Sequence, residues 1–179
     1  MPIGPKILLK LVKEVKLVEN LNKRELKNPE GAGFDLRMGE VYKIKGKGYL
    51  GIEERKTPEA KLVAKYKEKK KSSITINPHE QYLVTTLESV NLPQDITANM
   101  WLRSTLYRSG IIFSGGNIAP GYKGRLSFTF YNSGKSTVEI ELGARIVHIL
   151  FFRVEGSGNS YRGQWQGGRV TTTKREKQV

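Results

Sequence analysis

The sequence contains no cysteine and only two histidines, His79 and His148. Without cysteine the chain has no disulfide framework and no thiolate nucleophile. A zinc site built from cysteine and histidine is excluded as well, because the required ligands are missing. The fold must therefore depend on an ordinary hydrophobic core, for which 179 residues are enough in one domain.

Long hydrophobic runs are also missing. No apolar stretch approaches the roughly 20 residues that cross a bilayer. Near the start, Lys10 and Lys13 interrupt the apolar residues where a signal peptide would need an unbroken core. We therefore expect a soluble, cytoplasmic protein with no membrane partner.

Acidic residues are scarce relative to basic ones. The chain has 31 lysines and arginines against 17 aspartates and glutamates, which gives a net charge of +14. Such a protein attracts polyanions, including nucleic acids and nucleotides. Basic residues concentrate at 65–71 and 174–177. Charge alone leaves two interpretations of these clusters open: a solvated loop and tail, or a nucleic-acid contact through the basic loop.

The pattern of hydrophobic residues predicts one short helix followed by many short strands. Residues 6–15 place Leu8, Leu11, Val12 and Val15 on one helical face. The expected strands are, in chain order, 34–37, 41–44, 73–76, 82–87, 96–102, 126–131, 138–142 and 146–152. Many short strands with a single helix favour an all-β barrel or sandwich.

Several segments carry more specific expectations. Residues 126–131 alternate as a half-buried strand does, and residues 132–135 predict a hairpin connection to 138–142. The stretch 146–152 is apolar on both faces, as in a central or interface strand, and places His148 in the core or at a subunit interface. We expect a domain at 1–155 with a long charged loop at 46–72, and a flexible glycine-rich lid or tail at 156–179.

Residues 103–108 contain two arginines beside adjacent hydroxyls, Arg-Ser-Thr-Leu-Tyr-Arg. Guanidinium groups bind phosphate oxygens in pairs, and hydroxyls can fill the remaining positions. A polyphosphate site and an ordinary capped helix with surface arginines both fit this pattern. Asp35, in Gly-Phe-Asp-Leu-Arg at 33–37, is either a site residue or a strand-end residue in a turn.

Two further motifs surround the predicted strand at 126–131. Residues 117–124 read Asn-Ile-Ala-Pro-Gly-Tyr-Lys-Gly, which forms either a base-binding hairpin or an ordinary β-turn. Residues 161–168 read Tyr-Arg-Gly-Gln-Trp-Gln-Gly-Gly, where the glycine pair permits the closing motion of a lid. A disordered tail is the alternative.

Together these segments resemble the dCTP deaminase/dUTPase family, over about residues 33–168 and most clearly over 92–152. The match is nearest to the dCTP deaminase branch. It implies a distorted jelly-roll-like barrel of the dUTPase type, assembled as a homotrimer with sites shared between subunits. It also implies a nucleotide-metabolism hydrolase that binds dCTP or dUTP together with Mg²⁺.

The resemblance also implies roles for individual residues. The nucleotide-binding positions are Arg103, Ser104, Thr105, Arg108, Ile118, Gly121, Tyr122, Tyr161 and Gln164. Asp35 would lie near the phosphates and metal or brace the site, and no residue would bind the metal directly.

The two catalytic positions of the family lack their carboxylates in this sequence. Ala119 stands where the family has Asp, and Thr129 stands where the deaminase branch has Glu. Losing a general base typically costs roughly 10²–10⁴-fold in rate. We therefore expect nucleotide binding with poor turnover. A non-enzymatic nucleotide sensor and a nucleic-acid-binding protein remain the alternatives.

Overall fold

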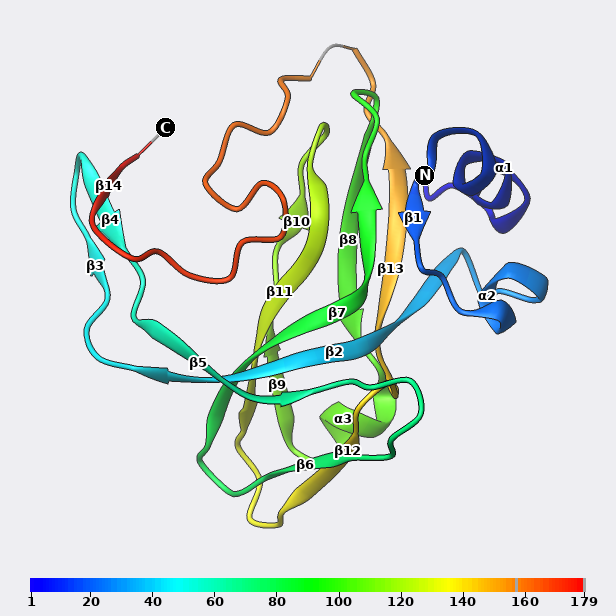
Figure 1. The fold of residues 1–179 in the computed structure, drawn as a ribbon. Helices are drawn as coiled ribbons and strands as arrows, with labels where there is room; N and C mark the ends of the chain where they lie inside the picture. Colours follow the sequence, from blue (N-terminus) through cyan, green and yellow to red (C-terminus); the bar gives the residue numbers. More distant parts are fainter. Residues whose placement is uncertain (157, 179) are drawn as a thin grey trace.

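The computed structural model of the protein describes residues 1–156 and 158–178, and its main feature is one strongly curled sheet (Figure 1). All pairings recorded within this sheet are antiparallel. Its strands, in spatial order, are β10 (Asn117–Ile118), β8 (Ile96–Leu102), β13 (Arg145–Arg153), β2 (Gly33–Lys45), β7 (Gln81–Asn91), β11 (Lys123–Asn132) and β9 (Ile111–Ser114). In addition, β1 (Val18–Glu19) pairs with β7, and β5 (Glu59–Lys65) pairs with β2. The prediction of an all-β fold is confirmed.

Smaller elements surround this sheet. β6 (Ser73–Ile76) pairs with β12 (Val138–Glu141), and β4 (Glu54–Lys56) pairs with both β3 (Tyr49–Leu50) and β14 (Glu176–Lys177). The helices of the described residues are α1 (Pro5–Val15), α2 (Lys23–Lys27) and α3 (Ser104–Arg108). None of these helices has the length and apolar character needed to cross a membrane.

The predicted N-terminal helix is confirmed, but the described residues also form two short helices that the sequence pattern did not predict. Pro5 starts α1, and Lys16 ends it in the left-handed conformation, with φ 54°. Leu8 is the fully buried anchor of its apolar face. The second helix, α2, is too short to show hydrophobic periodicity, and the side chain of Asn22 caps it by accepting a hydrogen bond from the Arg24 N–H (2.9 Å).

The core includes residues of the central strand β13 and of β11. β13 occupies a central position between β8 and β2, and its Val147, Ile149 and Phe151 are fully buried. On β11, Phe128 and Phe130 are buried as the alternating pattern predicts. Both predictions are therefore confirmed.

The prediction of two separate strands at 34–37 and 41–44 is wrong. The chain passes through Gly39 without a break and forms the single strand β2, with an irregular register against β7 between Met38 and Glu40. A Cβ atom on Gly39 would lie only 2.7 Å from the Thr86 carbonyl oxygen. The glycine therefore permits close approach of two strands and is not a turn signal here.

The predicted hairpin between 126–131 and 138–142 is also wrong. The chain turns at 132–135, but β12 then pairs with β6 and not with β11. Asn132 directs this turn, because its side-chain amide donates to the carbonyl oxygens of Ile76 and Ser136, both at 2.9 Å. Its Oδ1 accepts a hydrogen bond from the Gly134 N–H (2.9 Å). One fully buried amide thus ties the turn to β6.

The 46–72 segment is not the long loop that its charges predict. It contains β3, β4 and β5, and β5 pairs with β2 along residues 40–45. Most side chains of β5 are exposed, so the strand has little apolar periodicity for sequence reasoning to find. Backbone hydrogen bonds to β2 hold it in place.

The C-terminal tail crosses the open side of the curled sheet and ends beside β4 (Figure 1). The Thr57 N–H donates to the hydroxyl of Thr172, and the Thr172 N–H donates to the hydroxyl of Thr57, both at 2.9 Å. The tail therefore has defined contacts with the 46–72 segment. Its flexibility, and the division of the chain at residue 155, remain predictions.

Candidate functional site

The turn between β10 and β11 forms the tip of the predicted base-binding hairpin. Asn117 and Ile118 pair with Asn99 and Ala98 of β8, so β10 is an edge strand of the main sheet, whereas β11 lies between β7 and β9. The two arms of the predicted hairpin therefore pair with other strands and not with each other. Gly121 sits at φ 76° and Gly124 at φ 145°, which are conformations that glycine adopts without strain. A Cβ atom on Gly124 would also lie 2.3 Å from the backbone nitrogen of Gly168, so this glycine lets the tail approach.

A pocket of about 360 Å³ lies behind this hairpin, and we call it the hairpin pocket. Its walls come from segments that are far apart in the sequence: the hairpin, the tail, the connection from β4 to β5 with the start of β5, and single residues of β2, β7 and β8. The lining residues are Ile44, Thr57, Pro58, Ala60, Leu83, Met100, Gly116, Asn117, Ile118, Ala119, Tyr122, Leu126, Ser127, Tyr161, Trp165, Arg169 and Val170. The volume falls within the range of small-molecule sites, and the lining is mainly apolar, as such sites require.

The aromatic residues of the hairpin and tail meet at the pocket wall. The Tyr122 and Tyr161 rings contact edge to face, with centroids 5.2 Å apart. The Tyr122 hydroxyl donates to the Arg125 carbonyl oxygen (2.7 Å). Burial raises the pKa of Tyr122 to about 12, so this residue is a neutral hydrogen-bond donor at physiological pH.

Tail residues cover the outer edge of the hairpin through backbone and amide contacts. The Tyr161 N–H donates to the Pro120 carbonyl oxygen (2.7 Å). Gln166 accepts a hydrogen bond from the Lys123 N–H (2.9 Å) and donates to the Gly121 carbonyl oxygen (3.0 Å). The tail therefore packs against the hairpin, and its role as a lid remains a prediction. Trp165, Gln166 and Arg169 were not assigned to the site from sequence, because a glycine-rich segment gives no signal of its path.

The predicted phosphate residues lie at the opposite end of the sheet from the hairpin tip, on or next to α3 (Figure 1). Ser104, Thr105 and Arg108 are exposed there. Arg103 precedes the helix, and its guanidinium forms an ion pair with Asp35. Within one chain the structure thus separates the predicted phosphate residues from the predicted base residues.

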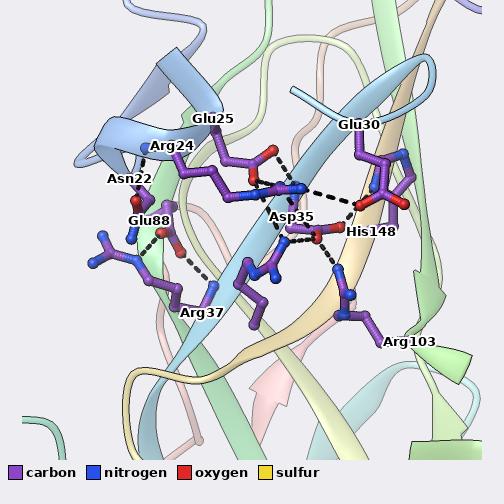
Figure 2. A network of polar contacts seen from close by, with 10 residues as sticks. Asn22, Arg24, Glu25, Glu30, Asp35, Arg37, Glu88, Arg103 and His148 are labelled. Atoms are coloured by element: carbon purple, nitrogen blue, oxygen red, sulfur yellow. Dashed lines mark hydrogen bonds and ion pairs between the residues drawn. The ribbon is translucent and has the colours of Figure 1, made fainter. Parts of the chain in front are cut away.

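Asp35 is the centre of a buried ionic network (Figure 2). Its carboxylate is bonded by the Arg103 guanidinium, by Arg145 Nη1 (2.9 Å) and by His148 Nδ1 (2.9 Å). Its backbone N–H donates to the buried carboxylate of Glu25 (3.1 Å), which comes from α2. Both oxygens of Asp35 are therefore occupied by basic side chains.

His148 belongs to this network and not to the hairpin pocket. Burial lowers the pKa of His148, while the charges of Glu25 and Glu30 oppose that shift. A neutral imidazole that donates to Asp35 through Nδ1 fits this environment. His148 is half-buried on β13, so it is not a core residue, and its place at a subunit interface remains a prediction.

Comparison with known proteins assigns the family. Residues 5–154 match the family model described as dCTP deaminase-like. A dCTP deaminase of Pyrococcus furiosus is 37% identical over 170 residues, which cover 94% of this chain and 96% of the relative. The chain belongs to the dCTP deaminase-like family.

Two further similar proteins show that related sequences and folds are linked to different reactions. A probable deoxyuridine 5′-triphosphate nucleotidohydrolase of Methanothermobacter thermautotrophicus is 31% identical over 93% of this chain and 99% of its own length. Among solved structures, the 2′-deoxycytidine 5′-triphosphate deaminase of Agrobacterium tumefaciens shares the fold with a TM-score of 0.64 at 16% identity. That alignment covers 84% of this chain and 46% of the other, so the chain spans about half of that protein. Family membership by itself therefore does not decide between deamination and triphosphate hydrolysis.

The two family positions for catalytic carboxylates fall at different places in this member. Ala119 lines the hairpin pocket, whereas Thr129 lies further along β11, paired with Leu83 and Ser114. No aspartate or glutamate is among the residues that line the pocket. Arg169 is the single charged group in that lining, so the described wall offers no carboxylate to activate water.

The buried carboxylate of Glu40 does not replace the missing groups. Burial would raise its pKa, but hydrogen bonds from Tyr42, Lys65 and Arg125 outweigh this and lower the pKa to about 2. Lys65 Nζ lies 2.9 Å and Arg125 Nη1 lies 3.0 Å from its oxygens. A carboxylate with so low a pKa is a weak base. Sequence reasoning did not find this network, because its members come from three different strands.

Proposed function

We propose that the protein binds a pyrimidine deoxynucleoside triphosphate, dCTP or dUTP, and turns it over poorly. The observation that carries this proposal is the hairpin pocket, which combines an apolar lining of ligand size with a wall that has no carboxylate. Family membership supports the substrate class, because its named relatives include dCTP deaminases and a probable dUTP nucleotidohydrolase. The cytoplasm, where such nucleotides are handled, is the proposed location.

A site shared between subunits would bring the predicted base residues of one chain together with the predicted phosphate residues of another. In one chain the predicted base-binding hairpin and α3 lie at opposite ends of the sheet (Figure 1). A groove between them exposes 62% of Trp101, 54% of Tyr107 and 53% of Ile112. Exposed apolar patches of this kind commonly mark contact surfaces. We propose that the protein is a homotrimer in which one subunit holds the base and a neighbour holds phosphates through Arg103, Ser104, Thr105 and Arg108.

Magnesium would enter with the triphosphate. Among the described residues, no three His, Asp or Glu side chains gather closely enough to hold a metal ion. Asp35, the one acidic candidate from the sequence, has its oxygens taken by Arg103, Arg145 and His148. This favours a bracing role for Asp35. Phosphate oxygens are the usual ligands of a nucleotide-bound Mg²⁺, which would offset phosphate charge.

The same pocket wall also supports a non-enzymatic nucleotide sensor. Binding depends on the pocket and the α3 residues, whereas chemistry depends on groups that positions 119 and 129 do not supply. The nucleic-acid alternative has only the charge of the 65–71 cluster behind it, and Lys65 in that cluster is paired with Glu40.

Calorimetry with dCTP and dUTP in Mg²⁺, followed by separate assays for ammonia and pyrophosphate, tests the proposed function. We expect saturable binding of at least one nucleotide and turnover well below ordinary enzyme rates. ATP serves as the matched control for a triphosphate without a pyrimidine. Absence of pyrimidine nucleotide binding would refute the proposal, and rapid turnover would refute its catalytic part.

A further inference from the structure

The buried polar groups that lack a hydrogen-bond partner gather around the hairpin pocket. Among the described residues they are Arg55 Nε and Nη2, Thr85 Oγ1, Ser127 Oγ and Gln164 Oε1. Buried polar groups in folded proteins are normally paired, so unpaired groups call for a missing partner such as water or a ligand. Their concentration at one site indicates that the partner belongs to that site.

Two of these groups lie in or directly behind the pocket wall, and a third belongs to a segment that contributes to that wall. Ser127 lines the pocket, and Thr85 is its neighbour across the β7–β11 pairing. Gln164 lies between Tyr161 and Trp165, two residues of the tail wall. The mainly apolar pocket therefore has a few polar points of attachment, which is the usual composition of a site that orients its ligand.

Arg55 is the charged member of the group, and it comes from the 46–72 segment. It lies on β4 opposite Glu176 of β14. Thr57, two residues further on, lines the pocket. Side chains two residues apart in an extended segment point to the same side, so Arg55 shares the side of Thr57. Arg55 lies opposite Glu176, the residue to which Arg169 of the pocket lining is bonded.

The carboxylate opposite Arg55 is already occupied. Arg169 Nη1 and Nη2 bond the two oxygens of Glu176 at 3.0 and 2.5 Å. Those hydrogen bonds lower the pKa of Glu176 against the opposing effect of burial, and the charges of Arg55 and Lys174 add to the lowering. One carboxylate therefore faces three cations. A guanidinium with unpaired, buried N–H groups is costly, and an anion would relieve that cost.

We propose that Arg55 binds a phosphate group of the nucleotide whose base and sugar occupy the hairpin pocket. This inference rests on the proposed function and adds the 46–72 segment to the nucleotide site. Two unpaired nitrogens of one guanidinium, Nε and Nη2, suit two phosphate oxygens. A triphosphate has several phosphate groups, so a contact with Arg55 leaves others for α3 of a neighbouring subunit.

The test compares ligands with and without phosphate on matched variants. Calorimetric affinities are measured for 2′-deoxycytidine, dCTP, 2′-deoxyuridine and dUTP with the unmodified chain, Arg55→Met and Arg175→Met. Arg175 is the control, because it directly precedes β14 of the same small sheet but stacks on the Tyr49 ring at 4.0 Å. We expect Arg55→Met to weaken triphosphate binding by roughly 10- to 100-fold, the usual range for a charged hydrogen bond. Nucleoside affinity should stay the same.

Each other outcome overturns the inference in a distinguishable way. Equal triphosphate affinities in Arg55→Met and Arg175→Met would refute the role of Arg55 and leave the proposed function intact. Equal losses for nucleoside and triphosphate would mean that Arg55 only shapes the pocket. No binding to the unmodified chain would refute both proposals. If Arg55→Met does not fold, Arg55→Lys keeps the charge without the fork, and unchanged triphosphate affinity in that variant would refute paired recognition.

Discussion

At the α3 end of the sheet, three basic side chains converge on the buried carboxylate of Asp35, whereas the hairpin pocket at the other end has no carboxylate in its lining. The first region is saturated, because both Asp35 oxygens have partners. The second leaves buried hydroxyl, amide and guanidinium groups unpaired. A saturated network stabilises and orients, while unpaired groups in a pocket are available to a ligand. This difference sets a fully paired ionic network apart from a pocket with unpaired polar groups.

Replacing Asp35 should produce the largest effect on stability. Asp35→Ala leaves Arg103, Arg145 and His148 without their shared acceptor and should lower the free energy of unfolding by about 3–5 kcal/mol. Urea denaturation measures this, with the exposed Glu68→Ala as a control that should change stability by less than about 0.5 kcal/mol. If the two variants are equally stable, Asp35 does not brace this end.

Restoring carboxylates at the pocket end should change chemistry more than stability. Ala119→Asp should raise pyrophosphate release from dUTP by about 10²-fold, since a general base contributes at least that much. Ala119→Asp combined with Thr129→Glu should favour ammonia release from dCTP.

Ala119→Asn is the matched control for this gain, because it has a similar shape but cannot act as a base. Thermal unfolding must accompany each assay, since a buried carboxylate without partners is itself destabilising. Equal activity in Ala119→Asn and Ala119→Asp would contradict the assignment of position 119.

The exposed arginine of α3 should affect binding but not folding. Arg108→Ala should weaken dCTP and dUTP affinity by roughly 10-fold or more, because phosphate charge is left unpaired. Lys13→Ala, which removes a surface charge on α1, is the control. Calorimetry that finds both variants equal to the unmodified chain would remove α3 from the nucleotide site.

Replacing Glu40 should produce an effect on stability that depends on pH. Its pKa is about 2 in the folded protein against an ordinary value of 4.5. The folded state therefore gains stability that is fully present above about pH 4.5 and is lost as the pH falls toward 2. Glu40→Gln should be less stable than the unmodified chain at pH 7 and should approach it at low pH. A stability difference that does not vary with pH would contradict the ionised pairing with Lys65 and Arg125.

Local patterns in the sequence were enough for much of the fold. The alternation on β11, the apolar run of β13 and the helix from Pro5 each depend on the spacing of neighbouring residues. The same patterns misjudged Gly39 and the partner of β12, because both depend on contacts with strands remote in sequence. Residue order can show that a strand forms, but not which strand lies beside it.

For the candidate site, the sequence by itself determined the family, the hairpin motif and the absence of carboxylates at positions 119 and 129. These are properties of residue identity and order. Only the tertiary structure decided that the tail and the 46–72 segment complete the pocket wall, and that Asp35 is enclosed by Arg103, Arg145 and His148. The physical reason is that pairing and burial depend on which distant segments meet. Arg55 is one of many basic residues in the sequence, and only its place beside the Arg169–Glu176 pair distinguishes it.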